Sequence, residues 1–327
     1  MSLTITNIIA EYGAYYLGDK TNMERLFTQL FAPTNFASAL KPMDTKGNTY
    51  QGSIASMSEV LQAFQKAFTA KGGATFEPCP NNLFKVKADL AEYPDELDGQ
   101  WTAFLRNEKI NRADWPFVRW WMEQLVVPRY RKDLDRAQYT GVYVAPTPGT
   151  AGNAVDSMNG MRYFLNYHVV TSGRMTSITT GTPDTDPEVW YDQLIDWYDT
   201  AQAAYPELIG EMPFINMSPT LLQRAKRGYN KKFKQSPDME KVSSVSDETF
   251  MKLDSTPVSL RGLEAMRGSN KIWMPVDGNA LDLSWMTKGA GEWSLETEDR
   301  KVKIWTDQWK GVGMAVPEWC VTNEQTV

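Results

Sequence analysis

Few residues of this chain could carry acid–base or nucleophilic chemistry. Its one histidine, His168, stands in an apolar run, residues 166–170, that predicts a strand. A histidine-based triad would have to be built around this single side chain. We therefore interpret His168 as a structural histidine whose hydrogen bonds are satisfied inside the fold.

Two pairs of carboxylates have spacings that could serve general acid–base catalysis. Asp133 lies close to Asp135, and Asp192 and Asp196 lie on one face of an expected helix. Paired carboxylates can divide the roles of acid and base. Solvated or salt-bridged helix faces explain the same pattern more simply, and we prefer that interpretation.

The motifs that hold nucleotides, phosphates or metals are missing from the sequence. It contains no G-x-S-x-G, no G-x-x-x-x-G-K-[ST] and no G-x-G-x-x-G between a strand and a helix. Cys79 and Cys320 lie far apart without C-x-x-C spacing, so neither a disulfide framework nor a zinc site is indicated. We predict no catalytic residue, no cofactor and no metal site.

A cluster of basic side chains is the best candidate for an electrostatic contact. Its members are Arg224, Lys226, Arg227, Lys231, Lys232 and Lys234. The cluster surrounds the apolar stripe of one expected helix, so a plain solvated face is the simplest interpretation. Two alternatives stay open: the cluster contacts the acidic surface of a neighbouring subunit, or it contacts packaged DNA. The formal charge of −6 argues against a protein that binds mainly by neutralising phosphates.

Large apolar rings are unusually frequent, with 12 Trp, 14 Tyr and 13 Phe beside 16 Met. Such side chains suit extensive self-contact, and they also suit a sugar-binding groove. Trp120 and Trp121 point about 100° apart on a helix, so one core should not easily bury both. We expect at least one of these two rings to lie between subunits.

The composition predicts a globular protein made in the cytosol. Hydrophobic residues make up 42% and charged residues 23% of the 327 residues, enough for one large or two moderate domains. The sequence has no apolar run of membrane-spanning length, and its first residues lack a secretory signal pattern. We expect no membrane partner.

Helical elements are marked by proline and capping residues. Asp114 before Trp115-Pro116 predicts a helix start, Pro128 should end or kink that helix, and continuation to Gly141 would make one long bent rod. Asp186-Pro187 and Ser218-Pro219 open two further helices, the second preceded by a short strand at residues 214–217. The Pro- and Gly-rich residues 146–152 form the strongest internal boundary.

Extended segments occupy the remainder. Residues 83–90 alternate with period two, and the last hundred residues contain four strand-like runs that predict antiparallel ribbons. Residues 60–68 have apolar side chains at helical spacing, but Gly72-Gly73 and the strand-like residues beyond leave that helix ambiguous.

Several phrases, taken in order, resemble major capsid proteins with the Hong Kong 97-like fold, especially those of phages of the Bacteroidetes. KVKADL, with YPDEL and QWTAFL after it, is similar to the end of the family's extended loop, and WPFV to the start of its spine helix. SMNGM, then FINMSP with YNKKF, resembles the axial domain. MRGSNKIWMP with GNAL resembles the return to the peripheral sheet. The order and spacing of the phrases carry the resemblance.

The resemblance implies an α+β subunit in five parts. These are an N-terminal arm at residues 1–35, an extended two-stranded loop at 36–100, a peripheral domain with the spine helix at 101–148, an axial domain at 149–260, and a return to the peripheral sheet at 261–327. The arm and the loop are expected to contact neighbouring subunits and to be poorly ordered in a free monomer.

The resemblance also implies the function of a non-enzymatic major capsid protein. The subunit would self-assemble as pentamers and hexamers into an icosahedral virion shell, built in the host cytoplasm around double-stranded DNA. Portal, separate scaffolding and decoration proteins would be its other partners. No lysine–asparagine crosslink can be placed. Two alternatives stay open, a carbohydrate-binding or carbohydrate-active protein and an encapsulin-like nanocompartment shell.

Overall fold

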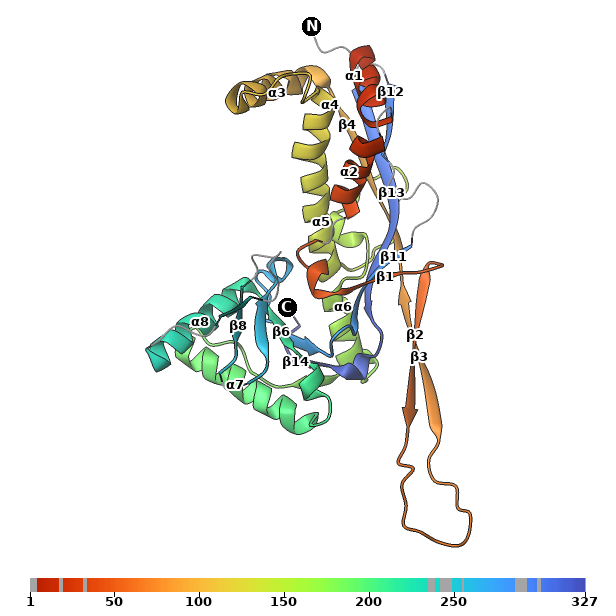
Figure 1. The fold of residues 1–327 in the computed structure, drawn as a ribbon, viewed down its shortest axis with the longest axis vertical. Helices are drawn as coiled ribbons and strands as arrows, with labels where there is room; N and C mark the ends of the chain where they lie inside the picture. Colours follow the sequence, from red (N-terminus) through yellow and green to blue (C-terminus); the bar gives the residue numbers. More distant parts are fainter. Residues whose placement is uncertain are drawn as a thin grey trace.

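The computed structural model describes residues 5–17, 20–31, 34–234, 239–241, 249–254, 256–285, 293–298 and 301–326. Figure 1 shows an elongated body with a compact lobe at its side and a narrow hairpin that protrudes from one end. The mixture of helices with largely antiparallel sheets confirms the predicted α+β class. The predicted domain boundaries remain a prediction.

The spine of the body is one helical rod. It consists of α4 (Phe117–Trp120), the π-helical η3 (Trp121–Val126) and α5 (Val127–Thr140). The prediction of a long rod that reaches Gly141 is confirmed. Because Pro128 has no backbone N–H and its ring needs space in the preceding turn, the wider π turn directly before it lets the rod continue.

The predicted cap of this rod is wrong. The residue at the N-cap position is Pro116, and no side chain caps the first turn. Asp114 instead uses its backbone carbonyl, which accepts a hydrogen bond of 2.7 Å from the Arg119 guanidinium.

A five-stranded sheet lies beside the spine. The long strand β13 (Lys301–Met314) pairs along one edge with β4 (Phe84–Glu92) and along the other with β12 (Ser294–Glu298) and β11 (Ala280–Trp285), all antiparallel. β1 (Lys41–Asp44) adds a parallel edge strand on β11. The antiparallel pairing predicted for the end of the chain is confirmed, but the runs at 302–305 and 312–316 share the single strand β13, so the turn expected between them is not formed.

The N-terminal segment packs on this body. It forms α1 (Ile5–Tyr12), the π-helical η1 (Gly13–Leu17) and α2 (Lys20–Phe31). Ile8, Tyr12, Tyr16 and Leu26 are buried in one core cluster with the spine, and the Tyr12 hydroxyl donates to the Trp293 carbonyl over 2.7 Å. The expected arm thus contacts its own chain, because its apolar face covers the spine.

The lobe is built on a seven-stranded sheet with the order β5-β14-β10-β6-β9-β8-β7. The strands are β5 (Thr176–Ile178), β6 (Phe214–Met217), β7 (Met239–Lys241), β8 (Thr249–Lys252), β9 (Ser259–Gly262), β10 (Trp273–Pro275) and β14 (Cys320–Asn323). Helices α7 (Pro187–Ala204) and α8 (Pro219–Phe233) lie together on it (Figure 1).

Both lobe helices begin as the sequence predicts. The Asp186 carboxylate accepts from the Glu188 amide at 3.1 Å, and the Ser218 hydroxyl accepts from the Leu221 amide at 3.3 Å. Their apolar stripes meet the sheet in a core that contains Trp190, Trp197 and Ile215.

Further helical elements connect these parts. They are η2 (Ala37–Ala39), α3 (Pro94–Glu108), η4 (Ala154–Asp156), α6 (Met161–Asn166), the π-helical η5 (Tyr167–Thr171), η6 (Ile209–Glu211), η7 (Glu264–Met266) and η8 (Pro317–Trp319). The run that contains His168 is therefore helical, and the strand predicted there is wrong. Packing of Phe164 and Leu165 in the core fixes this helix despite its β-branched valines.

The protruding hairpin consists of β2 (Thr49–Met57) and β3 (Ala74–Asn82), paired antiparallel from Thr49–Asn82 to Met57–Ala74. Residues 58–73 beyond it have no helix or strand, so the helix suggested by the spacing of residues 60–68 is not formed. The hairpin belongs to the predicted extended loop, whereas β1 and β4 of the same range join the body sheet.

Candidate assembly surfaces

The end of the hairpin exposes a concentrated apolar surface. We call residues 58–73 the hairpin tip. Within it, Val60, Leu61, Phe64 and Phe68 are 57%, 87%, 93% and 96% exposed. Figure 1 shows the tip far from the body and the lobe. Large apolar side chains gathered on a protruding segment are typical of a contact with another chain.

The base of the hairpin is fixed to the body and the lobe. The Arg174 guanidinium bonds both Glu318 carboxylate oxygens, at 2.6 and 3.3 Å, and donates to the Pro78 carbonyl at 3.4 Å. At Gly52, an added Cβ would lie 2.7 Å from the Ala315 carbonyl oxygen, so only glycine allows this close approach. The hairpin therefore leaves the body in a defined direction.

Three of the four paired carboxylates, those of Asp133, Asp135 and Asp192, have structural partners. Arg129 forms an ion pair of 2.9 Å with Asp133, and Asp135 accepts from the Phe36 amide at 2.7 Å. Asp192 forms an ion pair with Lys232. This arrangement agrees with the salt-bridged interpretation of both pairs.

His168 is buried at 6% exposure on η5. Its Nδ1 lies 3.0 Å from the Ser172 hydroxyl, one helical turn away. Burial lowers the pKa of His168 to about 4; the nearby Arg174 guanidinium acts in the same direction and Glu318 in the opposite one. Among the described residues no carboxylate is hydrogen-bonded to the ring, so a catalytic triad is not assembled around it.

The low pKa of His168 predicts that acid destabilises the fold. Above about pH 6.5 the imidazole is neutral in both states. As the pH falls from there towards about 4, the unfolded chain takes up a proton that the folded chain still refuses, so stability decreases. We expect urea midpoints to fall over this window and the fall to shrink in His168→Gln. Because the sequence has one histidine, an equal decline in both proteins would contradict the assignment.

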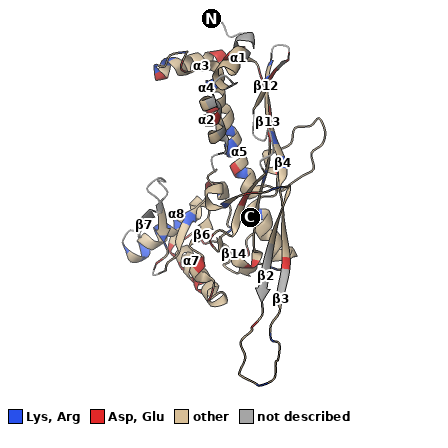
Figure 2. Ribbon diagram, turned by 45° about the vertical axis from the view of Figure 1, so that its right-hand side comes forward, with Lys and Arg blue, Asp and Glu red and all other residues tan. Residues whose placement is uncertain are grey.

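The basic cluster lies on and just after α8, and two of its six side chains form ion pairs within the same chain. Arg224 donates to the Asp184 carbonyl at 2.6 Å, Lys231 forms an ion pair of 3.1 Å with Asp186, and Lys232 pairs with Asp192. Figure 2 shows basic positions in blue on α8 and acidic positions in red on α7 of the same lobe. Lys226, Arg227 and Lys234 make no ion pair with a carboxylate of the described residues, and they form the free part of the cluster.

The expectation that one chain cannot bury both Trp120 and Trp121 is wrong. Their exposed fractions are 4% and 3%, and both rings pack on Phe117, with centroids 5.9 and 6.1 Å from it. The rod is covered on more than one side, by α1, by α3 and by the sheet, so two neighbouring helical faces meet apolar groups. Neither ring offers a free surface to another subunit.

The tryptophans of the last part of the chain differ in how far they are buried. Trp293 is buried in the spine cluster, and Trp285 packs against Trp309 at 5.3 Å on adjacent strands. Trp319, on η8, is 42% exposed. Trp285, Trp305 and Trp309 lie on the same sheet and are each half-buried, so part of these rings remains in solvent.

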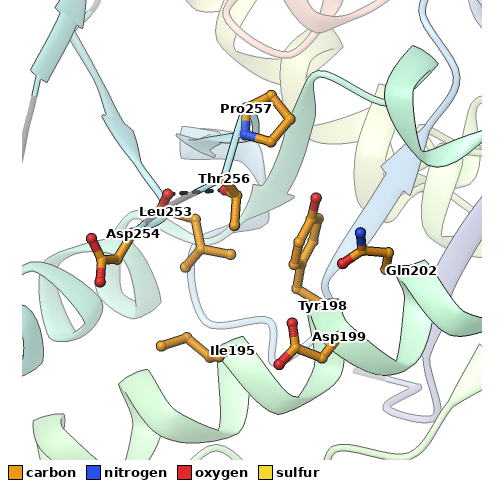
Figure 3. A pocket seen from close by; sticks show the side chains of 8 residues that line it. All are labelled: Ile195, Tyr198, Asp199, Gln202, Leu253, Asp254, Thr256 and Pro257. Carbon is orange, nitrogen blue, oxygen red and sulfur yellow. Dashed lines mark hydrogen bonds between the residues drawn. The ribbon is translucent and has the colours of Figure 1, made fainter.

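The two best-formed hollows are small or open. One, of about 230 Å³, lies between α7 and the turn after β8, where Tyr198, Asp199 and Asp254 face it (Figure 3). The other, of about 470 Å³, lies between α2 and α5 beside Arg131 and Asp135. The first is below the range of about 300–1,000 Å³ usual for ligand pockets. No group of three or more metal-ligating side chains occurs in the described residues.

Helices long and apolar enough to cross a membrane are not found in the described part of the chain.

The hairpin tip is the surface with the most exposed large apolar side chains in the described residues. The sequence contained its signal, four large apolar residues within nine positions, but only the structure showed that they lie in solvent.

No family model matches the chain, and no curated protein matches it in sequence. Solved structures do match over nearly its whole length. A chain of the procapsid of satellite phage P4, described together with its size determination protein, has a TM-score of 0.59 at 11% identity, covering 93% of this chain and 90% of that one.

Two further structures match similarly. The SrpI encapsulin of Synechococcus elongatus has a TM-score of 0.52 at 10% identity, covering 89% of this chain and 86% of that one. The capsid of Myoviridae phage XM1 has a TM-score of 0.50 at 12% identity, covering 90% and 91%. At such identities the likeness concerns the fold. The chain therefore has the fold of phage capsid proteins, the Hong Kong 97-like fold that its sequence resembles.

Proposed function

We propose that the chain is the major capsid protein of a tailed phage and self-assembles into an icosahedral shell around double-stranded DNA. The observation that carries this proposal is the capsid fold combined with an apolar hairpin tip that the chain leaves in water. Burial of such a side chain yields about 1.5–3 kcal/mol, so four of them leave substantial free energy for contact between copies.

The principal partner is therefore the chain itself, as pentamers and hexamers. In this arrangement the hairpin of one subunit lies over the next. Portal, separate scaffolding and decoration proteins complete the particle, which is assembled in the host cytoplasm. The subunit acts structurally and without catalysis. This fits the structural partners of His168 and of the carboxylate pairs.

An encapsulin-like nanocompartment is the second candidate, favoured by the likeness to the SrpI encapsulin. Both candidates form closed shells, so the contents of the particle distinguish them. Packaged nucleic acid supports the capsid, whereas a cargo enzyme without nucleic acid supports the nanocompartment.

Negative-stain microscopy of the expressed full chain, combined with light scattering, tests the shell function. We expect closed particles, or capsomers that close when scaffolding protein is added. A subunit that stays a monodisperse monomer at high concentration in both conditions would contradict the proposal. Glycan binding by such a monomer would favour the carbohydrate alternative.

The free part of the basic cluster gives a test of contact with DNA. We propose that Lys226, Arg227 and Lys234 make weak, nonspecific contacts with packaged DNA. Replacing all three with Gln should reduce the slope of log K against log salt for DNA binding by capsomers, by about 0.9 for each lost phosphate contact. Replacement of Lys231 and Lys232, which are paired with α7, is the control and should change the slope less. An unchanged slope in the triple variant would contradict the proposed contact with DNA.

A further inference from the structure

We propose that residues 59–71 of the hairpin tip fold into an amphipathic helix when the tip docks on a second copy of this chain. The proposal rests on the proposed shell function and adds a change of secondary structure to it. In the structure these residues are an open loop whose apolar side chains face solvent.

The order of the tip residues is that of a helix. Val60, Leu61, Phe64, Ala67 and Phe68 stand at i, i+1, i+4, i+7 and i+8, which places all five on one helical face. Gln62 and Lys66 fall on the opposite face. A strand would instead distribute Val60, Phe64 and Phe68 to one side and Leu61 and Ala67 to the other. The pattern therefore favours a helix as the docked form.

Both ends of the segment also have helix signals. Ser58, directly after β2, is a suitable N-cap, and Glu59 in the first turn and Lys71 in the last complement the helix dipole. Gly72 follows, already with a φ of +93°, the left-handed region that a C-terminal glycine cap uses. A helix over residues 59–71 would be about 20 Å long, whereas paired strands lie about 5 Å apart. The Ser58–Gly73 closure, and the strand pairs next to it at Met57–Ala74, must therefore open when the helix forms.

The free subunit has a reason to leave this helix unformed. A helix of about 13 residues is marginal in water without a surface to pack on. Two hydrogen bonds close the base of the tip instead. The Ser58 amide donates to the Gly73 carbonyl at 3.3 Å, and the Gly73 amide donates to the Ser58 hydroxyl at 2.9 Å. Lys71 ties the loop to Glu59 at 2.9 Å. To cap the helix, the Ser58 hydroxyl must release the Gly73 amide and accept from an amide in the first helical turn instead.

The surface that the helix meets belongs to another copy. Nine-residue strands extend about 30 Å, so the tip is held well away from its own core. Figure 1 shows no other part of the chain near it. The fixed base at Arg174 and Gly52 prevents the hairpin from folding back. A shell supplies a second copy at a constant distance for every tip.

Electron cryomicroscopy of assembled particles made from the full chain tests the proposal directly. Helical density for residues 59–71 against an adjacent subunit is the expected result. Particles in which the tip is extended, or does not touch a neighbour, would overturn this inference and leave the shell function standing. A chain that forms no particles would overturn both.

A matched pair of variants gives a second readout. Ala is a strong helix former and a poor strand former, whereas Thr has the opposite preferences. Gln62→Ala with Lys66→Ala should therefore assemble at a lower threshold concentration than Gln62→Thr with Lys66→Thr. For two helical positions the difference is roughly tenfold. Both pairs remove the same two side chains from the polar face. Equal thresholds, or the reverse order, would overturn the helix.

Discussion

Replacement of Phe64 and Phe68 together with Ser is expected to abolish shell assembly while the subunit stays folded. The two rings are 93% and 96% exposed, so their loss removes nothing from the core of the free subunit. In a shell each ring would contribute about 2–3 kcal/mol on burial. The loss should raise the threshold concentration for assembly at least about a hundredfold, measured by light scattering and microscopy.

The control for this variant lies in the same tip. Gln62→Ser with Thr69→Ser introduces the same residue at two polar positions and should leave assembly nearly unchanged. Thermal melting of both proteins should coincide with that of the parent chain. Normal particles from the Phe64, Phe68 variant would show that the tip is not an assembly surface.

Trp190→Ala is expected to lower the free energy of unfolding by about 3–5 kcal/mol. The ring is 0% exposed between α7, α8 and the lobe sheet, and its Nε1 donates to the Leu221 carbonyl over 3.0 Å. The substitution leaves a large cavity and also removes the partner of a buried carbonyl. Urea unfolding followed by circular dichroism measures the loss.

Trp319→Ala is the matched control, because the same side chain is removed at a position that is 42% exposed. Its effect should be near 1 kcal/mol, since the ring already contacts water. Equal losses in the two variants would contradict the assignment of Trp190 to the centre of the lobe core.

Sequence determined the elements whose signals are local. Asp186-Pro187 and Ser218-Pro219 start helices because a side-chain oxygen caps the first turn and proline lacks the N–H that the turn cannot use. The alternation in residues 302–305 predicts a strand because neighbouring side chains point to opposite faces. The resemblance in the order of its phrases indicated the capsid fold, which the structure confirms.

Tertiary structure decided what depends on distant neighbours. Trp120 and Trp121 are both buried because α1, α3 and the sheet surround the spine, and no local pattern contains that fact. The helix at His168 exists because Phe164 and Leu165 enter the core. Two of the six residues of the basic cluster, Lys231 and Lys232, are neutralised because Asp186 and Asp192 lie beside α8.

The hairpin tip shows the division most clearly. Its sequence determines a helical face of large apolar residues, but a short helix is stable only when that face is covered. Strand pairing between residues 49–57 and 74–82 carries the face away from every surface of its own chain. Sequence thus specified which residues must be buried together, and the tertiary structure decided that this chain alone cannot bury them, because burial depends on what lies within contact distance.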